Sequence, residues 1–97
     1  MTATAFHGLE LIYLFAAWGA VLSGGVEYQP NADDLAISAT LQAAWARFAA
    51  TGDASGDGLD WPVYVGATDD HVVLDVPPGT GQLLRKAQCD FWDSLLP

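Results

Sequence analysis

The residues from Asp34 to Ala50 constrain the fold most, because they carry the clearest helical pattern in the chain. Either Asp33 or Asp34 can accept hydrogen bonds from the first amides of such a helix, and Gly52 can end it as a C-cap glycine. The apolar side chains of one helical face are Ile37, Leu41, Ala44, Trp45 and Phe48. The sequence therefore predicts an amphipathic helix that packs one face in a core.

The size of the chain limits that core. A domain of 97 residues buries roughly 60–65% of the surface of its unfolded chain. Yet 52% of the residues are hydrophobic and only 15% are charged. This is more apolar surface than so small a body can hide, so we expect a large buried contact with another chain. We interpret the sequence as a fragment.

The charge of the chain argues against two classes of partner. Twelve acidic residues and three basic ones give a formal net charge of −9. Proteins that bind nucleic acids or anionic membranes need clustered lysine or arginine, so we expect neither partner. The apolar run Leu11–Leu22 has twelve residues, whereas a membrane span needs about 20. No basic residue precedes it as in a signal peptide, so we interpret the run as buried core and leave the localisation unknown.

The other predicted elements are short. Leu9–Leu22 is compatible with a helical turn or two followed by irregular chain. Trp61–Val65 and His71–Val76 are typical of two strands of a hairpin, with Pro77–Gly81 as a loop after them. Gln82–Leu95 is typical of a final helix. The predicted fold is therefore an α+β fragment of two or three helices and one short β-hairpin, without a complete parallel sheet.

Local motifs offer little chemistry. In the loop "GDASGDGLD", Asp53, Ser55 and Asp57 match the first half of a calcium-binding loop, but Tyr64 stands where a bidentate glutamate is required. We interpret this segment as a solvated acidic loop. The sequence contains no G-x-S-x-G, C-x-x-C or H-E-x-x-H motif and no phosphate-binding glycine loop. We expect no metal and no cofactor. His71 is expected to be an ordinary exposed histidine at the edge of the hairpin.

His7 is the one serious catalytic candidate. It precedes Gly8 in "AFHGLELIYLF", and a glycine lets the backbone bend sharply where a loop must deliver an imidazole. The apolar residues that follow would bury the returning chain and fix the loop, and a general base needs a fixed geometry. Taken alone, the pattern leaves two interpretations open: an ordinary packed histidine, or half of a proton relay whose other members lie elsewhere.

Four ordered signatures resemble the C-terminal end of the type-B carboxylesterases, the cholinesterase-like branch of the α/β-hydrolases. "AFHGLELIYLF" is similar to that family's H-G-x-E-L/I-x-Y/F-V/L-F, and "LQAAWARFAATGD" to its W-x-x-F-A-x-x-G-D/N-P. "DWPVY" is similar to W-P-x-Y, and "CDFWD" to C-x-F-W. One departure is Ala54, which stands where the family usually has proline.

The resemblance implies that His7 is the triad histidine, which deprotonates a serine and later protonates the leaving alcohol. Glu10 matches the acid of the same motif, and we expect it to give polar support near the histidine. The triad runs Ser…Glu/Asp…His in chain order, so the serine, the acid and the oxyanion hole would precede this segment. Residues 1–97 are thus expected to be an incomplete carboxylesterase domain, hydrolysing carboxylic esters in the complete enzyme and inactive alone.

The resemblance also implies the partner, which is the missing N-terminal portion of the esterase. The alternative is a non-enzymatic orphan fragment that self-associates into a small helical oligomer through the helix at 34–50 and the Leu11–Leu22 run. Cys89 matches a cysteine that, in some members, bridges to an upstream one. From this sequence it is either a buried apolar thiol or half of a bridge to a partner that the chain lacks.

Overall fold

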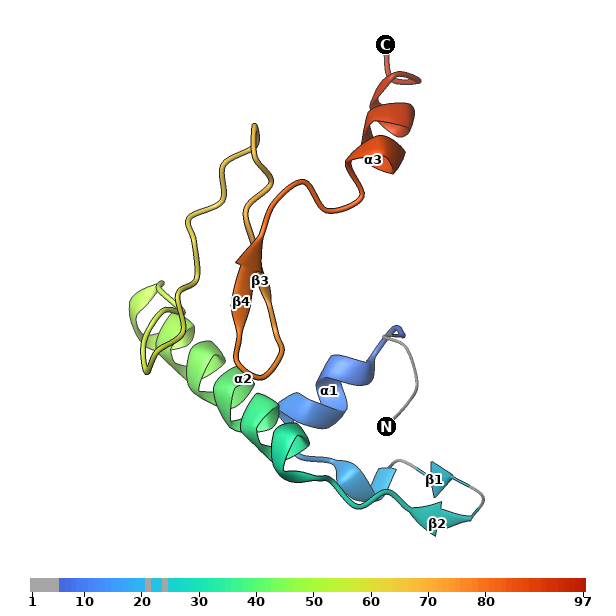
Figure 1. Cartoon of the computed structure of the whole chain (residues 1–97), viewed down its shortest axis with the longest axis vertical. Helices are drawn as coiled ribbons and strands as arrows, with labels where there is room; N and C mark the ends of the chain where they lie inside the picture. The colour runs from blue at the N-terminus through green and yellow to red at the C-terminus, as the bar shows by residue number, and fades with distance from the viewer. Residues whose placement is uncertain (1–5, 21, 24) are drawn as a thin grey trace.

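The structure is a computed structural model that describes residues 6–20, 22–23 and 25–97 (Figure 1). Its helices are α1 (Leu9–Leu14), the 3₁₀ turn η1 (Trp18–Ala20), α2 (Ala32–Thr51) and α3 (Lys86–Asp93). Its strands form two antiparallel pairs, β1 (Leu22–Ser23) with β2 (Val26–Glu27), and β3 (His71–Val73) with β4 (Gly79–Gly81). The predicted α+β class is confirmed, and the described residues form no parallel sheet. Across these residues, no helix combines the length and the apolar character that crossing a membrane requires.

Helix α2 is the longest element of the fold, and its N-cap differs from the predicted one. The cap is Asn31, whose side-chain oxygen accepts from the Asp34 amide at 2.9 Å, while the Asp34 carboxylate accepts from the Asn31 amide at 2.9 Å. This reciprocal arrangement is a capping box. The prediction of Asp33 or Asp34 as the cap was wrong, because Asp34 closes the box from inside the helix. The predicted C-cap is confirmed at Gly52, where φ is 79°.

The chain before α2 is irregular, as the sequence predicts, except for one added hairpin. Helix α1 is six residues long and is followed by η1. The chain then reverses between β1 and β2, where Leu22 pairs with Glu27 and Ser23 with Val26. Strands of two residues are too short to carry an alternating pattern, and the sequence therefore did not reveal them.

The second hairpin does not pair the segments that the sequence indicates. Trp61–Val65 forms no strand, and β3 pairs instead with β4, which lies in the predicted loop Pro77–Gly81. The register places His71 opposite Gly81, where an added Cβ would lie 2.6 Å from the imidazole Nε2. The glycine makes this pairing possible. After Val65 the chain makes a helical turn, because the amides of Thr68 and Asp69 both donate to the Val65 carbonyl.

Helix α3 is shorter than the predicted Gln82–Leu95. It begins only at Lys86, because Leu83 and Arg85 have φ values of 56° and 55° and so interrupt the helical conformation. All residues from 82 to 97 are exposed. Figure 1 shows α3 at the far end of the molecule from α1 and α2.

The molecule is open, and its core is small. The buried residues among those described are Leu41, Ala44, Leu59, Asp34 and Ser38. The radius of gyration is 16.1 Å, against about 12.5 Å for a compact chain of this length. The accessible surface is 7063 Å², which exceeds by about 1,700 Å² the surface of a compact protein of this mass. The chain alone therefore leaves an unusually large surface uncovered.

Candidate functional site

His7 lies on a tight turn immediately before α1. The Leu9 amide donates to the Phe6 carbonyl at 3.1 Å, and Gly8 at the N-cap has φ of 87°, a conformation that side chains with a Cβ adopt only with strain. The His7 side chain is exposed, and in the part of the chain that the structure describes it makes no hydrogen bond or ion pair. The interpretation of His7 as a packed residue is therefore wrong for this structure. The glycine bend that the sequence predicts is confirmed.

Glu10 lies in the first turn of α1 and is also exposed. No hydrogen bond joins it to His7 or to any other described side chain. The structure thus places the two predicted site residues three positions apart on the same short segment without bringing them into contact. The supporting role of Glu10 stays a prediction.

Three polar side chains of α2 hold the other end of α1. The Tyr13 hydroxyl donates to the Asp34 carboxylate at 2.8 Å. The Ser38 hydroxyl donates to the Tyr13 carbonyl at 2.5 Å, and the Gln42 amide donates to the Leu14 carbonyl at 3.0 Å. The last carbonyls of a helix have no partner within the helix, so α2 satisfies groups that α1 itself leaves open.

Asp34 is the most buried charged group of this region. Its side chain is 6% exposed and accepts from Tyr13, from the Tyr28 hydroxyl at 2.6 Å and from the Asn31 amide. Burial acts to raise the pKa of Asp34, but the hydrogen bonds from Tyr28, Asn31 and Tyr13 together hold that pKa below its ordinary value. The carboxylate is therefore ionised at neutral pH despite its burial.

The pKa values of the two tyrosines, Tyr13 and Tyr28, are raised rather than lowered. Burial, and then the hydrogen bond to Asp34, raise the pKa of Tyr13 to about 12. The hydrogen bond to Asp34 raises the pKa of Tyr28. The Trp18 ring packs edge-on against Tyr13, with centroids 4.9 Å apart, and lies 6.3 Å from Tyr28. Sequence reasoning missed this cluster, although Asn31 and Asp34 have the spacing of a capping box.

An apolar groove of about 910 Å³ lies between the C-terminal end of α2 and the segment that follows. Apolar residues that line it include Trp45, Phe48, Trp61, Pro62 and Val63. The Trp45 and Trp61 rings meet edge to face with centroids 5.7 Å apart. The prediction that the whole apolar face of the helix packs in a core was wrong, since Trp45 is 43% and Phe48 61% exposed.

Comparison with known proteins places the chain among esterases. No family model matches it. Carboxylesterase 5A of Canis lupus familiaris is 33% identical over 96 residues, which cover 96% of this chain and 16% of that protein. Acetylcholinesterase of Leptinotarsa decemlineata is 30% identical over 92 residues, which cover 94% of this chain and 14% of that protein.

Solved structures agree. A PNB esterase structure is 29% identical, covers 96% of this chain and 18% of its own, and superposes with a TM-score of 0.76. A thermophilic PNB esterase is 28% identical, covers 87% of this chain and 17% of its own, and has a TM-score of 0.74. This chain belongs with the type-B carboxylesterases. It spans about one sixth of the length of the relatives it matches.

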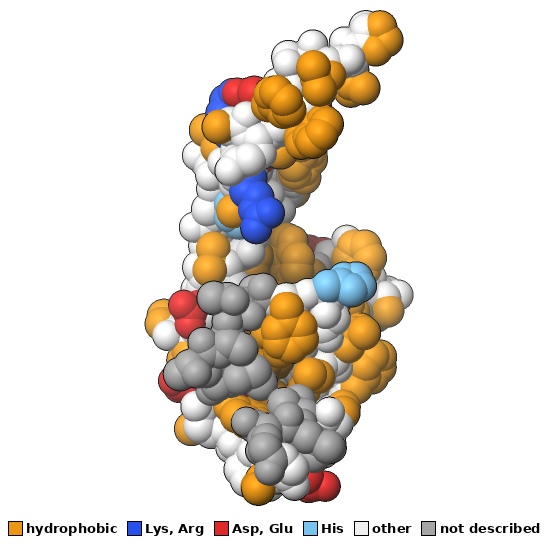
Figure 2. All heavy atoms as spheres, turned by 90° about the vertical axis from the view of Figure 1, so that its right-hand side faces the viewer, with side chains coloured by type: hydrophobic (Ala, Val, Ile, Leu, Met, Phe, Trp, Pro, Cys, Tyr) orange, Lys and Arg blue, Asp and Glu red, His pale blue; other side chains and the backbone are white. Residues whose placement is uncertain are grey.

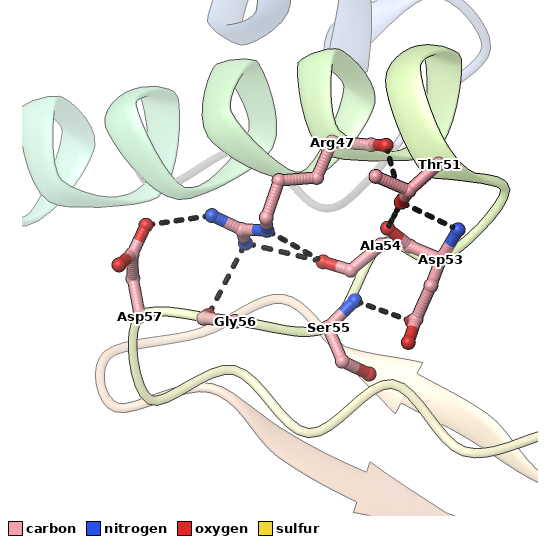
Figure 3. A network of polar contacts seen from close by, with 7 residues as sticks. All are labelled: Arg47, Thr51, Asp53, Ala54, Ser55, Gly56 and Asp57. Atoms are coloured by element: carbon pink, nitrogen blue, oxygen red, sulfur yellow. Dashed lines mark hydrogen bonds and ion pairs between the residues drawn. The ribbon is translucent and has the colours of Figure 1, made fainter.

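The acidic loop of this esterase segment has contacts of its own (Figure 3). The Arg47 guanidinium donates to the carbonyls of Ala54 and Gly56 at 3.1–3.2 Å and to Asp57 at 2.7 Å. The Asp53 carboxylate accepts from the Ser55 amide at 2.8 Å. The residues that resemble a calcium loop thus face different partners.

Metal ligands are not gathered elsewhere either. Within the described ranges, no three histidine, cysteine or acidic side chains lie close enough to hold a metal ion. The half-exposed His71 has its Nδ1 atom 3.1 Å from the Asp69 carbonyl oxygen.

Two other predictions, both of burial, are wrong because the side chains concerned are exposed. Cys89 is an exposed free cysteine, so the interpretation as a buried thiol was wrong, and a bridge to an absent partner stays a prediction. The Leu11–Leu22 run was interpreted as buried core, yet Leu11 is 50% and Phe15 71% exposed. In both cases no other part of the described chain covers the side chain.

Proposed function

We propose that this chain supplies the catalytic histidine, His7, of a serine carboxylesterase and acts only together with the rest of such an enzyme. The observation that carries the proposal is an exposed histidine on a glycine turn, in a chain that matches carboxylesterases over 96% of its length. We assign Glu10 the role of polar support for the imidazole.

The chemistry is acyl transfer to a serine. One imidazole nitrogen of His7 takes the proton of the serine hydroxyl as its oxygen attacks the ester carbonyl. When the tetrahedral intermediate collapses, the carbon–oxygen bond to the alcohol breaks and the imidazolium protonates the leaving oxygen. Water then repeats the same sequence on the acyl-enzyme. An imidazole suits both steps because it gains and loses a proton near neutral pH.

The proposed partner is the remainder of the esterase, which would supply the serine, the triad acid and the oxyanion hole. The exposed surface supports a partner of this size. The chain exposes about 1,700 Å² more than a compact protein would. An obligate interface removes about 1,000–2,500 Å² from each side, so the excess fits one large, permanent contact.

The test replaces the matching segment of a PNB esterase with residues 1–97. We expect the graft to hydrolyse carboxylic esters, and His7→Gln to lower its kcat by about 10³-fold or more. His71→Gln in the same graft is the matched control and should leave the rate unchanged. A folded graft that works equally well with His7→Gln would refute the role of His7. The chain alone should show no hydrolysis above background.

A second candidate function is a non-enzymatic fragment that self-associates into a small helical oligomer. The exposed apolar side chains of α2 and α3 favour it, with Phe48 at 61% and Trp92 at 65% exposure. The net charge of −9 opposes it, because copies of so acidic a chain repel one another. Native mass spectrometry separates the two: a multiple of 10.3 kDa supports self-association, and a complex with a much larger chain supports the esterase.

A further inference from the structure

We propose that Asp34, together with Ser38 and Gln42, is a positioning set that fixes α1 on α2 and thereby sets the direction of the His7 turn. The inference rests on the proposed function, because it concerns how the catalytic imidazole is held. None of these residues need touch the ester.

The three side chains follow one face of α2. They are spaced four residues apart, and residues at that spacing lie above one another on a helix. They bind three successive groups at the end of α1: the Tyr13 hydroxyl, the Tyr13 carbonyl and the Leu14 carbonyl. Three directed bonds fix both the position of α1 along α2 and its rotation.

Helix α1 needs such support. Its six residues are too few for a stable helix in water. None of its residues is buried in the described structure, so apolar packing holds it weakly. The polar bonds from α2 therefore add to this weak apolar contact and give α1 a defined orientation.

The burial of Asp34 exceeds what capping requires. A capping box functions with an exposed carboxylate, whereas burying a carboxylate is costly unless hydrogen bonds compensate. Asp34 is 6% exposed, and two of its three hydrogen bonds come from tyrosine hydroxyls rather than from the capped amide. Of these bonds, the one from Tyr13 comes from α1. The buried carboxylate thus serves as the anchor for α1.

The anchor is close enough to His7 to control it. The Phe6–Leu9 turn is bonded directly into α1, since the Leu11 amide donates to the Gly8 carbonyl at 3.2 Å. Tyr13 lies six positions after His7, and six positions span about 9 Å along a helix. A tilt of about 10° over that distance moves the imidazole by about 1.5 Å, and a misplacement of about 1 Å can cost about 10² in rate.

The test compares Tyr13→Phe with Tyr28→Phe in the 97-residue chain. Each variant removes one hydroxyl from Asp34, but only Tyr13 belongs to α1. We expect Tyr13→Phe to speed hydrogen exchange of the Leu11 and Phe15 amides by about tenfold and to shift the His7 imidazole signals in NMR spectra. Tyr28→Phe should leave both unchanged within about twofold.

Three results would overturn the proposal. Equal effects of the two variants would show that Asp34 supports the fold generally and not α1 in particular. Unchanged hydrogen exchange of the α1 amides in Tyr13→Phe would show that the Tyr13–Asp34 hydrogen bond does not stabilise α1. Amides of α1 that already exchange at the rate of an unfolded chain in the unmodified protein would show that α1 is not held.

The PNB esterase graft separates this inference from the proposed function. In a graft, Tyr13→Phe should lower kcat and leave KM unchanged, because the substrate site is intact and only the base is displaced. If Tyr13→Phe releases α1 while His7→Gln leaves hydrolysis intact, the positioning role stands and the catalytic role falls. If His7→Gln abolishes hydrolysis while Tyr13→Phe alters neither exchange nor kcat, only the positioning role falls.

Discussion

The α1–α2 region and the C-terminal arm, residues 82–97, are stabilised in opposite ways. In the first, α2 buries Asp34, Ser38, Leu41 and Ala44, and short hydrogen bonds tie it to α1. In the second, every residue is exposed, and α3 is held by little beyond its own backbone. The histidine-bearing region is therefore ordered by contacts within the chain.

The arm carries apolar side chains that nothing in the described chain covers. Phe91 and Trp92 pack against each other with centroids 5.3 Å apart, yet they are 57% and 65% exposed. Figure 2 shows apolar side chains gathered along the upper part of the molecule, where α3 lies. The α1–α2 region is thus held by contacts within the chain, whereas the apolar side chains of the arm have no such contacts among the described residues.

Substitutions in the core of α2 should destabilise the chain more than substitutions in the arm. Leu41 is 2% exposed, so Leu41→Ala should lower the free energy of unfolding by about 3 kcal/mol through lost burial and a cavity. Trp92→Ala removes a larger but exposed side chain and should cost less than about 0.5 kcal/mol. Urea unfolding followed by circular dichroism measures both. Equal losses of unfolding free energy in the two variants would show that the arm is as well packed in solution as the α1–α2 region.

The pH dependence of stability should be governed by the α1 anchor. The pKa of Tyr13 is raised to about 12, so its contribution is fully present below pH 10 and is lost as the pH rises through about 12. The pKa of Asp34 is lowered, so its contribution is present above its ordinary value of 3.8 and is lost as the pH falls through the lower folded value. Unfolding measured across pH should show a weaker alkaline dependence in Tyr13→Phe, with the part due to Tyr28 remaining because its pKa is also raised. An unchanged profile would show that Tyr13 does not contribute.

Removing the Arg47 side chain, which binds the acidic loop, should lower stability less than the Leu41 substitution. Arg47→Ala removes every bond from its guanidinium to the loop at 53–60 and should cost about 1–2 kcal/mol. Limited proteolysis should then cut within that loop. Asp57→Asn is the control: the Asp57 side chain is 85% exposed, and such a pair contributes less than about 1 kcal/mol. Cleavage that is as fast in Asp57→Asn would mean that the ion pair, rather than the bonds to Ala54 and Gly56, holds the loop.

Sequence patterns predicted the local features of the fold, which depend on residues close together in the chain. The presence of a helix along α2, its Gly52 cap and the bend at Gly8 are local, and all three are confirmed, although α2 begins two residues earlier than predicted. The Tyr13–Asp34 bond joins residues 21 positions apart, and no local pattern encodes it. Strand β4 reads Gly-Thr-Gly, which has no alternation to recognise.

The exposure of the aromatic face of α2 could not be predicted for another reason. Trp45 and Phe48 carry the pattern of a buried face, and a pattern does not tell which chain supplies the covering surface. The sequence was therefore right about apolar character and wrong about burial within this chain.

Removing an ion pair within the arm should change stability least. Lys86 and Asp90 form an ion pair one helical turn apart on α3, and both side chains are more than half exposed. Lys86→Ala should therefore change stability very little, and even less at high salt. Helicity measured at low and high salt checks this. A loss as large as that expected for Arg47→Ala would mean that the Lys86–Asp90 pair is shielded from water. The arm would then be covered in solution, and the difference between the two regions would belong to the isolated chain and not to the protein as it works.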